Sequence, residues 1–193
     1  LAPVSTGTAI TALAVGDEIW VSDQSLDGVM RWSFDGATYL GDVDCSGTLA
    51  LSSPAGMEIV GGTVYIADRG NNRVVTVDAA THTAYGSFAA GSTGVAPAYD
   101  VLFVNHLGYG DELLVDDGSD DNLDEFTLTG TYRRTFHASD GSSGIDQPQQ
   151  IAVAAGGTIL AAGSTAPRGI YEYNTSGAQI SYWARDVSSR GVY

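Results

Sequence analysis

The chain has 193 residues and a formal net charge of −15, and 44% of its residues are hydrophobic. This apolar content is enough for a buried core, and no segment approaches the roughly 20 apolar residues of a membrane-spanning helix. All eight basic residues are arginine, against 18 aspartates and five glutamates. The surface therefore repels polyanions and offers no basic cluster, which excludes nucleic acid as a partner.

The first repeat, residues 9–45, alternates apolar runs with polar turns. We expect its strands at 12–15, 18–22, 29–34 and 39–43. The turns fall at Gly16-Asp17, at Gln24 to Gly28 and at Asp35-Gly36, because glycine and aspartate favour turn conformations.

The second repeat, residues 54–90, follows the same pattern. Its strands are expected at 56–60, 63–67, 74–77 and 85–88. In the second of these strands Val64 and Ile66 point to one face and Tyr65 to the other, so both faces are apolar. A strand of this kind belongs to a sheet that neighbouring sheets cover on both sides.

The third and fourth repeats, 97–137 and 147–184, complete the series. We expect strands at 100–104, 112–115, 124–128 and 132–136, and then at 150–154, 158–162, 169–173 and 179–183. The residue that ends the second strand of each repeat is Asp23, Asp68, Asp116 and finally Gly163, at separations of 45, 48 and 47 residues. This period, with four strands and almost no helix, is typical of β-propeller blades. The sequence predicts an all-β fold, with residues 1–193 as a single β-propeller domain of four visible four-stranded blades and tails at 1–8 and 185–193.

The segment from Asp68 to Val74, which reads Asp-Arg-Gly-Asn-Asn-Arg-Val, resembles the NHL-repeat family of β-propellers and its secreted bacterial relatives. Looser copies follow at Val115 to Asp120 and at Ala161 to Ser164. The resemblance implies the propeller fold for nearly the whole chain. It does not imply one activity, since NHL-like propellers include lyases, lactone hydrolases and pure binding scaffolds.

The number of blades leaves two architectures open. The resemblance implies six blades, and this chain holds four, so it is either part of a larger propeller or a four-bladed ring. An open array would expose two apolar blade faces. We therefore expect closure within the chain, with the two tails latching the ring.

The turns after the second strands are expected to gather at one end of the ring, where ligands bind. One of them holds Asp116, Asp117, Asp120 and Asp121, which could bind calcium through carboxylate oxygens. The spacing does not fit the helix-loop-helix calcium pattern, because Gly118 comes too early and no glutamate stands at the required distance. The alternative is a solvated turn, for which aspartate is a common residue.

A second turn holds Asp68, Arg69, Asn71, Asn72 and Arg73, the one locally cationic turn of an acidic chain. Its arginines could bind a carboxylate or a sugar sulfate through paired hydrogen bonds. The alternative is structural. In NHL-like blades such residues often tie the turn to the neighbouring blade by pairing with an aspartate.

No catalytic residues are expected. His82, His106 and His137 occupy unlike places in their repeats, so we do not expect them to converge on a metal ion, and no Gly-x-Ser-x-Gly motif occurs. Trp20 and Trp32 lie in strands and are expected in the core, whereas Trp183 is expected to be exposed.

The sequence favours an extracellular, non-enzymatic module that binds a protein partner or assembles with itself through its terminal segments. Low lysine content, frequent serine and threonine, and the glycosylation sequon at Asn174 point to secretion. The alternative is an NHL-like lyase or hydrolase with a calcium or zinc ion in the central channel. A third possibility is glycan binding by the aromatic side chains.

Overall fold

The computed structural model describes residues 10–90, 97–105, 110–118, 121–137, 145, 147–164 and 168–184. Its strands, in chain order, are β1 (Ile10–Val15), β2 (Glu18–Asp23), β3 (Gly28–Ser33), β4 (Tyr39–Asp42), β5 (Pro54–Val60), β6 (Thr63–Asp68), β7 (Arg73–Asp78), β8 (Thr83–Ala89), β9 (Val101–Val104), β10 (Glu112–Asp117), β11 (Asn122–Thr127), β12 (Tyr132–His137), β13 (Pro148–Val153), β14 (Ile159–Gly163), β15 (Gly169–Tyr173) and β16 (Gln179–Ala184). Two single turns of 3-10 helix, η1 (Gly47–Leu49) and η2 (Arg69–Asn71), lie in connections. No helix in this part of the chain is long and apolar enough to cross a membrane.

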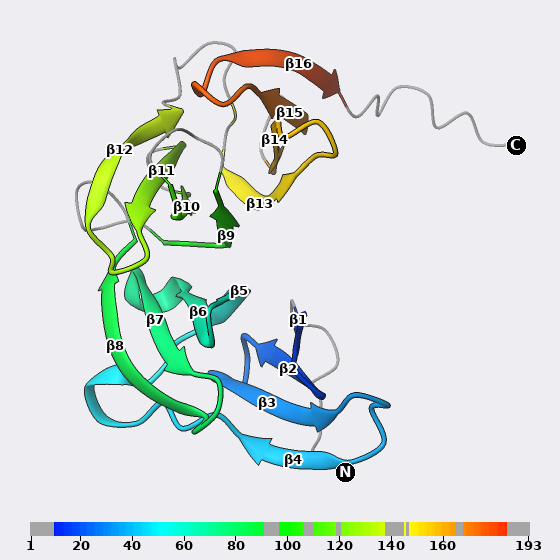
Figure 1. Ribbon diagram of the computed structural model, residues 1–193, viewed down its shortest axis with the longest axis vertical. Coiled ribbons are helices and arrows are strands. Elements are labelled where there is room, and N and C mark those ends of the chain that lie inside the picture. Colours follow the sequence, from blue (N-terminus) through cyan, green and yellow to red (C-terminus); the bar gives the residue numbers. More distant parts are fainter. Residues whose placement is uncertain are drawn as a thin grey trace, which may run out of the picture.

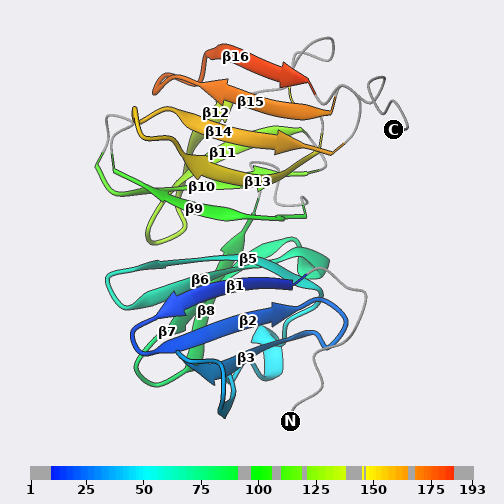
Figure 2. The ribbon, with the colours of Figure 1, turned by 90° about the vertical axis from the view of Figure 1, so that its right-hand side faces the viewer.

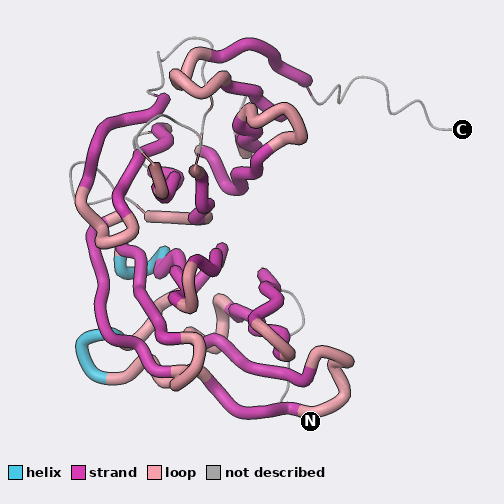
Figure 3. The backbone as a smooth tube through the Cα atoms, in the orientation of Figure 1, coloured by secondary structure: helices cyan, strands magenta, loops and turns pink. Residues whose placement is uncertain are grey.

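The strands form four sheets, each of four consecutive antiparallel strands. The first strands of the sheets, β1, β5, β9 and β13, lie innermost, and β4, β8, β12 and β16 lie at the outside (Figure 1). Figure 3 shows how little of the backbone is helical. The prediction of an all-β propeller fold with four-stranded blades is confirmed, and each of the sixteen expected strands is present with its bounds within two residues of those expected.

Three apolar clusters join the sheets in sequence. Trp20 of the first sheet packs with Val64 and Val75 of the second, Tyr65 of the second with Phe126 of the third, and Leu114 of the third with Tyr171 of the fourth. These large side chains are almost fully buried. The sheets therefore stack face to face, as Figure 2 shows from the side, and each covers the apolar face of the next.

The expected closure into a four-bladed ring is wrong. The four sheets form an open arc, in which the first and fourth sheets lie on either side of the gap (Figure 1). Closing a ring with four sheets needs about a quarter turn at every interface, which is larger than the roughly 30° that is usual between sheets packed face to face. The tails 1–8 and 185–193, which were expected to latch the ring, lie outside the described residues.

Hydrogen bonds cross each interface at, or close beside, the innermost strands. Ser22 Oγ donates to the carbonyl of Ala55 at 2.8 Å, and the Gly56 amide donates to the carbonyl of Tyr99 at 2.8 Å. The Ile151 amide donates to Asp100 Oδ2 at 3.0 Å. These bonds fix the positions of the strands that surround the axis of the arc.

A second kind of tie joins a turn of one sheet to the segment that enters the next. Asp27, with φ of 51°, accepts a hydrogen bond at 2.7 Å from the amide of Ser53, with φ of 49°. Two sheets further on, Asp121 (φ 57°) accepts one at 2.7 Å from Gln147 (φ 45°). Aspartate tolerates this left-handed backbone better than most residues. The same type of joint therefore occurs twice in the chain, each time with an aspartate as the acceptor.

Candidate functional site

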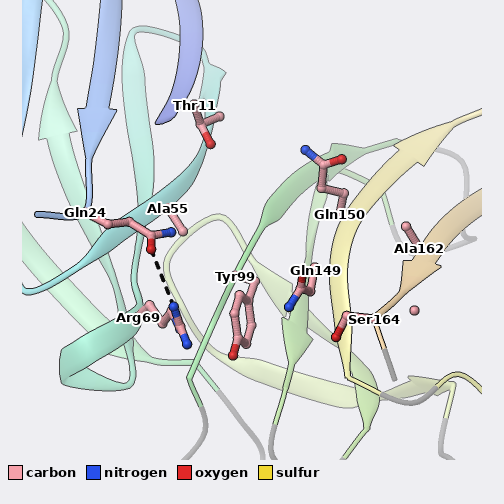
Figure 4. Close-up of a pocket in the computed structure, with 10 residues that line it drawn as sticks. Thr11, Gln24, Ala55, Arg69, Tyr99, Gln149, Gln150, Ala162 and Ser164 are labelled. Carbon is pink, nitrogen blue, oxygen red and sulfur yellow. Dashed lines mark hydrogen bonds between the residues drawn. The ribbon is translucent and has the colours of Figure 1, made fainter. Parts of the chain in front are cut away.

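A cavity of about 410 Å³ opens at one end of the arc's axis (Figure 4). It is lined by residues from all four sheets or their adjoining segments: Thr11, Gln24, Ala55, Arg69, Tyr99, Gln149, Gln150, Ala162, Gly163 and Ser164. Gln24, Arg69 and Ser164 come from three of the turns that follow second strands. The prediction that these turns gather at one end is confirmed for those three.

Arg69 is the cationic group of this cavity. The short helix η2 positions it, and its guanidinium lies 4.3 Å from the centre of the Tyr99 ring and 3.5 Å from Gln24 Oε1. A guanidinium over an aromatic face is stabilised by the ring's electron density. Within the part of the chain that the structure describes, no carboxylate pairs with Arg69, so its charge is directed to the cavity.

The remaining lining groups are neutral. The side chains of Gln24, Gln149 and Gln150 can each donate and accept hydrogen bonds, and Tyr99 offers a ring face and a hydroxyl. Arg69 and Tyr99 are the titratable residues among those that line the cavity, which include no aspartate, glutamate, histidine or cysteine. The lining can bind an anion or a polar ring, but it holds no nucleophile paired with a base.

The other residues of the cationic turn hold the turn together. Asp68 is fully buried and accepts hydrogen bonds from Arg73 Nε at 2.6 Å, from the Ser52 amide at 2.7 Å and from Asn71 Nδ2 at 2.9 Å. Arg73 also donates to two backbone carbonyls of the preceding connection. Asn72 ends η2 in the left-handed conformation. Of the five residues predicted to bind a ligand, Arg69 faces the cavity. Asp68, Asn71 and Arg73 bond to one another or to the backbone, and Asn72 ends the short helix.

Two of the aspartates predicted to bind calcium, Asp116 and Asp121, have backbone partners. Asp116 is fully buried, and its Oδ1 accepts hydrogen bonds from the amides of Tyr99 and of Asp100, the latter at 2.9 Å. Asp121 forms the tie to Gln147 described above, and Asp120 lies outside the described residues. Among the residues that are described, no three acidic, histidine or cysteine side chains are grouped so that they could hold a metal ion. Calcium binding at Asp116, Asp117, Asp120 and Asp121 stays a prediction.

Two of the histidines lie on different outer parts of the arc. His82 is in the turn between β7 and β8, 3.0 Å from an Arg31 nitrogen. His137 ends β12, where its ring lies 4.3 Å from the Tyr173 ring. His106 is outside the described residues. For His82 and His137, this arrangement agrees with the expectation that the histidines do not converge.

Asn174 lies in the turn between β15 and β16. Its side-chain oxygen accepts hydrogen bonds from the amides of Ser176 and Ala178, each at 3.0 Å, and from Ser176 Oγ at 2.7 Å. The turn joins the two outer strands of the fourth sheet (Figure 1), and none of its residues lines the cavity. Glycosylation at Asn174 stays a prediction.

Buried carboxyl groups lie behind the cavity wall. Burial raises the pKa of Asp100 to about 7 and also raises that of Asp116 well above its usual value. Because the folded chain then binds more protons than the unfolded chain between about pH 4 and pH 7, stability falls as the pH rises through this range.

We expect Asp100→Asn to flatten this pH dependence. The substitution removes one titrating group, and a full proton corresponds to a slope of about 1.4 kcal/mol per pH unit. Urea unfolding at pH 5, 6, 7 and 8 measures the slope, and Asp111→Asn, at an exposed aspartate, is the control. Equal slopes in the wild type and in Asp100→Asn would contradict the prediction.

Sequence reasoning missed most of the cavity lining. Gln150 begins the expected strand 150–154, and Tyr99 and Gln149 directly precede expected first strands, yet all three line the cavity. The signal that could have found them is their place at the beginning of a repeat's first strand, because first strands surround the channel of a propeller.

Comparison with known proteins establishes the fold. No model of a protein family matches the sequence, and no curated protein does either. Among solved structures, hydrazine synthase from Kuenenia stuttgartiensis matches with a TM-score of 0.71 at 15% identity, over 92% of this chain and 49% of that one. Virginiamycin B lyase from Staphylococcus aureus matches with a TM-score of 0.66 at 15% identity, over 90% and 54%. A catalytically inactive variant of that lyase with quinupristin matches with a TM-score of 0.69 at 14% identity, over 94% of this chain and 57% of that one. The chain thus has the β-propeller fold and spans about half the length of the structures it matches.

Proposed function

We propose that this chain is an extracellular, non-enzymatic β-propeller module that binds a small anionic or polar ligand at the axial cavity. The observation that carries the proposal is Arg69, whose charge faces a cavity lined by neutral polar groups. A cation that pairs with no carboxylate among the described residues, on a protein of net negative charge, attracts anions.

The ligand class follows from the lining. A carboxylate or a sugar sulfate can accept paired hydrogen bonds from Arg69, while the amides of Gln24, Gln149 and Gln150 can bond to hydroxyl groups. Tyr99 can pack against an apolar ring face. An acidic or sulfated monosaccharide fits these groups, which also supports the glycan binding suggested by the sequence.

The finer assignment is to an NHL-repeat-like propeller of the secreted bacterial type. It is supported by the Asp68 to Val74 motif and by the absence of lysine. Extracellular or cell-surface location, glycosylation at Asn174 and a protein partner or self-assembly belong to the same proposal. Serine, threonine and glycine content supports the location.

An NHL-like lyase or hydrolase is the second candidate. Two observations favour it: virginiamycin B lyase has a similar fold, and Asp100, with a pKa of about 7, lines a second hollow beside the axis. A pKa in this range suits a general acid or base. Metal analysis separates the candidates, because a stoichiometric calcium or zinc ion would favour the enzyme.

The binding proposal is tested with Arg69→Gln. We expect this variant to lose at least about tenfold in affinity for glucuronate or a sulfated monosaccharide, since a hydrogen bond to a charged group contributes about 1.5–3 kcal/mol. Titration followed by NMR or calorimetry measures the affinity. Arg133→Gln is the control, because it also removes one positive charge but lies in the outer strand β12, away from the cavity. If the two variants bind equally, or if neither probe binds the wild type, the site is not the one proposed.

A further inference from the structure

The fourth sheet, β13 to β16, has two apolar faces. One packs on the third sheet, where Ile159, Ala161, Tyr171 and Tyr173 are at most 1% exposed. Because side chains alternate along a strand, the residues between these point the other way, toward the gap of the arc. A sheet exposed to water on one side would carry polar residues there.

The face toward the gap is instead largely apolar. Cross-strand pairing places Gln150, Ala162, Ile170 and Trp183 in one row, and Ala152, Leu160, Glu172 and Ser181 in the next. Ile170 is 46% exposed and Trp183 is 50% exposed. Both rows border a hollow of about 360 Å³ lined in part by Leu160 and Ile170. This gap-facing surface of the fourth sheet is called the last face below.

The first sheet has a matching surface on the other side of the gap. Its covered side includes Trp20, so the alternating residues Ile19, Val21 and Trp32 face away from the second sheet. These three are partly exposed, and the Trp32 ring lies 5.4 Å from that of Tyr39. This surface, called the first face below, is as apolar as the last face.

Both faces carry little charge for a protein with a net charge of −15. The last face holds one acidic residue, Glu172, which accepts a hydrogen bond from Thr158 at 2.6 Å. In the rows of the first face formed by β2, β3 and β4, the acidic residues are Asp42, which accepts one from the Tyr39 hydroxyl at 2.6 Å, and Asp23 at the end of β2, which is buried and accepts one from Ser25 Oγ at 2.9 Å. Low charge on these two faces keeps like charges from being placed against each other where two copies of this acidic chain would meet.

We propose that a second copy of this chain closes the ring, with the first face of each copy packed on the last face of the other. The size of the missing part supports this occupant. The solved propellers that match extend over about twice this chain, of which it covers 49 to 57%, so one further copy supplies the missing arc. A two-fold axis along the channel creates both new contacts at once.

The new contacts would repeat the packing already present between the sheets of one copy. Each existing interface joins two apolar faces through aromatic and aliphatic side chains, and Trp183, Ile170, Ile19 and Trp32 offer the same chemistry. The closed assembly would also surround the axial cavity with sheets from both copies. This inference does not depend on the ligand proposed above.

Native mass of the 193-residue protein tests the inference. We expect a dimer of twice 20.0 kDa by sedimentation or native mass spectrometry, with a disc-like profile in small-angle scattering. Trp183→Ser and Ile170→Ser should each weaken dimerisation at least about tenfold, since truncating a buried aromatic or aliphatic anchor costs more than about 1.4 kcal/mol.

Tyr85→Ser is the matched control. Tyr85 is 60% exposed and lies in the outermost strand of the second sheet, whose two faces are both covered, so its loss should leave the dimer intact. Circular dichroism checks that all variants fold. A wild-type monomer at micromolar concentration, or a dimer that Trp183→Ser and Ile170→Ser leave unchanged, overturns the proposal. A monomer would mean that other sheets or no partner cover these faces.

Discussion

Asp68→Ala should lower the free energy of unfolding by about 3–5 kcal/mol, the usual cost of removing one partner of a buried ion pair. The carboxylate is fully buried and accepts from Arg73, from the Ser52 amide and from Asn71. Its loss leaves the partly buried Arg73 guanidinium with backbone carbonyls alone as acceptors, and it leaves the Ser52 amide without its acceptor. The entry to the second sheet would then lose its anchor.

Urea unfolding at pH 7 measures this effect, with Asp35→Ala as the control. Asp35 also accepts backbone and hydroxyl hydrogen bonds in a turn, but it is exposed, so the loss should be smaller. Asp68→Asn keeps the size of the side chain, and its destabilisation should lie between those of Asp68→Ala and Asp35→Ala. If Asp68→Ala and Asp35→Ala were equally mild, the buried pair would not stabilise the turn as argued.

Gly177→Ala should destabilise the chain by about 3 kcal/mol or more, through a steric clash added to backbone strain. Gly177 has φ of +86° in the turn between β15 and β16, and a Cβ there would collide with the carbonyl oxygen of Phe136 in the third sheet. The same glycine's carbonyl lies 3.0 Å from His137 Nδ1. Relief of the clash therefore requires the third and fourth sheets to separate locally.

Gly62→Ala separates the two contributions to that effect. Gly62 has the same φ of +86° and nothing within 4 Å of the Cβ position, so only the strain of about 1 kcal/mol should remain. Thermal or urea unfolding of both variants gives the difference. Equal losses in the two would show that the contact between Gly177 and Phe136 contributes nothing.

The strands could be predicted because their signal is local. Alternation of apolar and polar residues, with glycine and aspartate at the turns, placed every strand within a few residues. Ring closure could not be predicted in the same way, because curvature depends on how far side chains such as Trp20 and Tyr171 hold the sheets apart. A repeat pattern contains no such distance.

The candidate site was predicted only in part for a related reason. Arg69 and Arg73 are four residues apart and chemically identical, yet Arg69 faces the cavity over Tyr99 while Arg73 turns back to Asp68. The sequence likewise does not distinguish a carboxylate that could bind calcium from one that accepts backbone amides, as Asp116 does. Both distinctions arise from contacts between segments that are far apart in the chain.

The paired left-handed joints at Asp27 with Ser53 and at Asp121 with Gln147 bear on how such a molecule evolves and unfolds. Each joint uses only groups from two adjacent repeats. A duplicated repeat would therefore carry the residues of its own joint, and the loss of a repeat would disturb only the contacts with its neighbours. Cooperativity in such an array decays with separation along the series. In an open monomer, amide exchange should accordingly be fastest in the terminal repeats and slowest in the middle two.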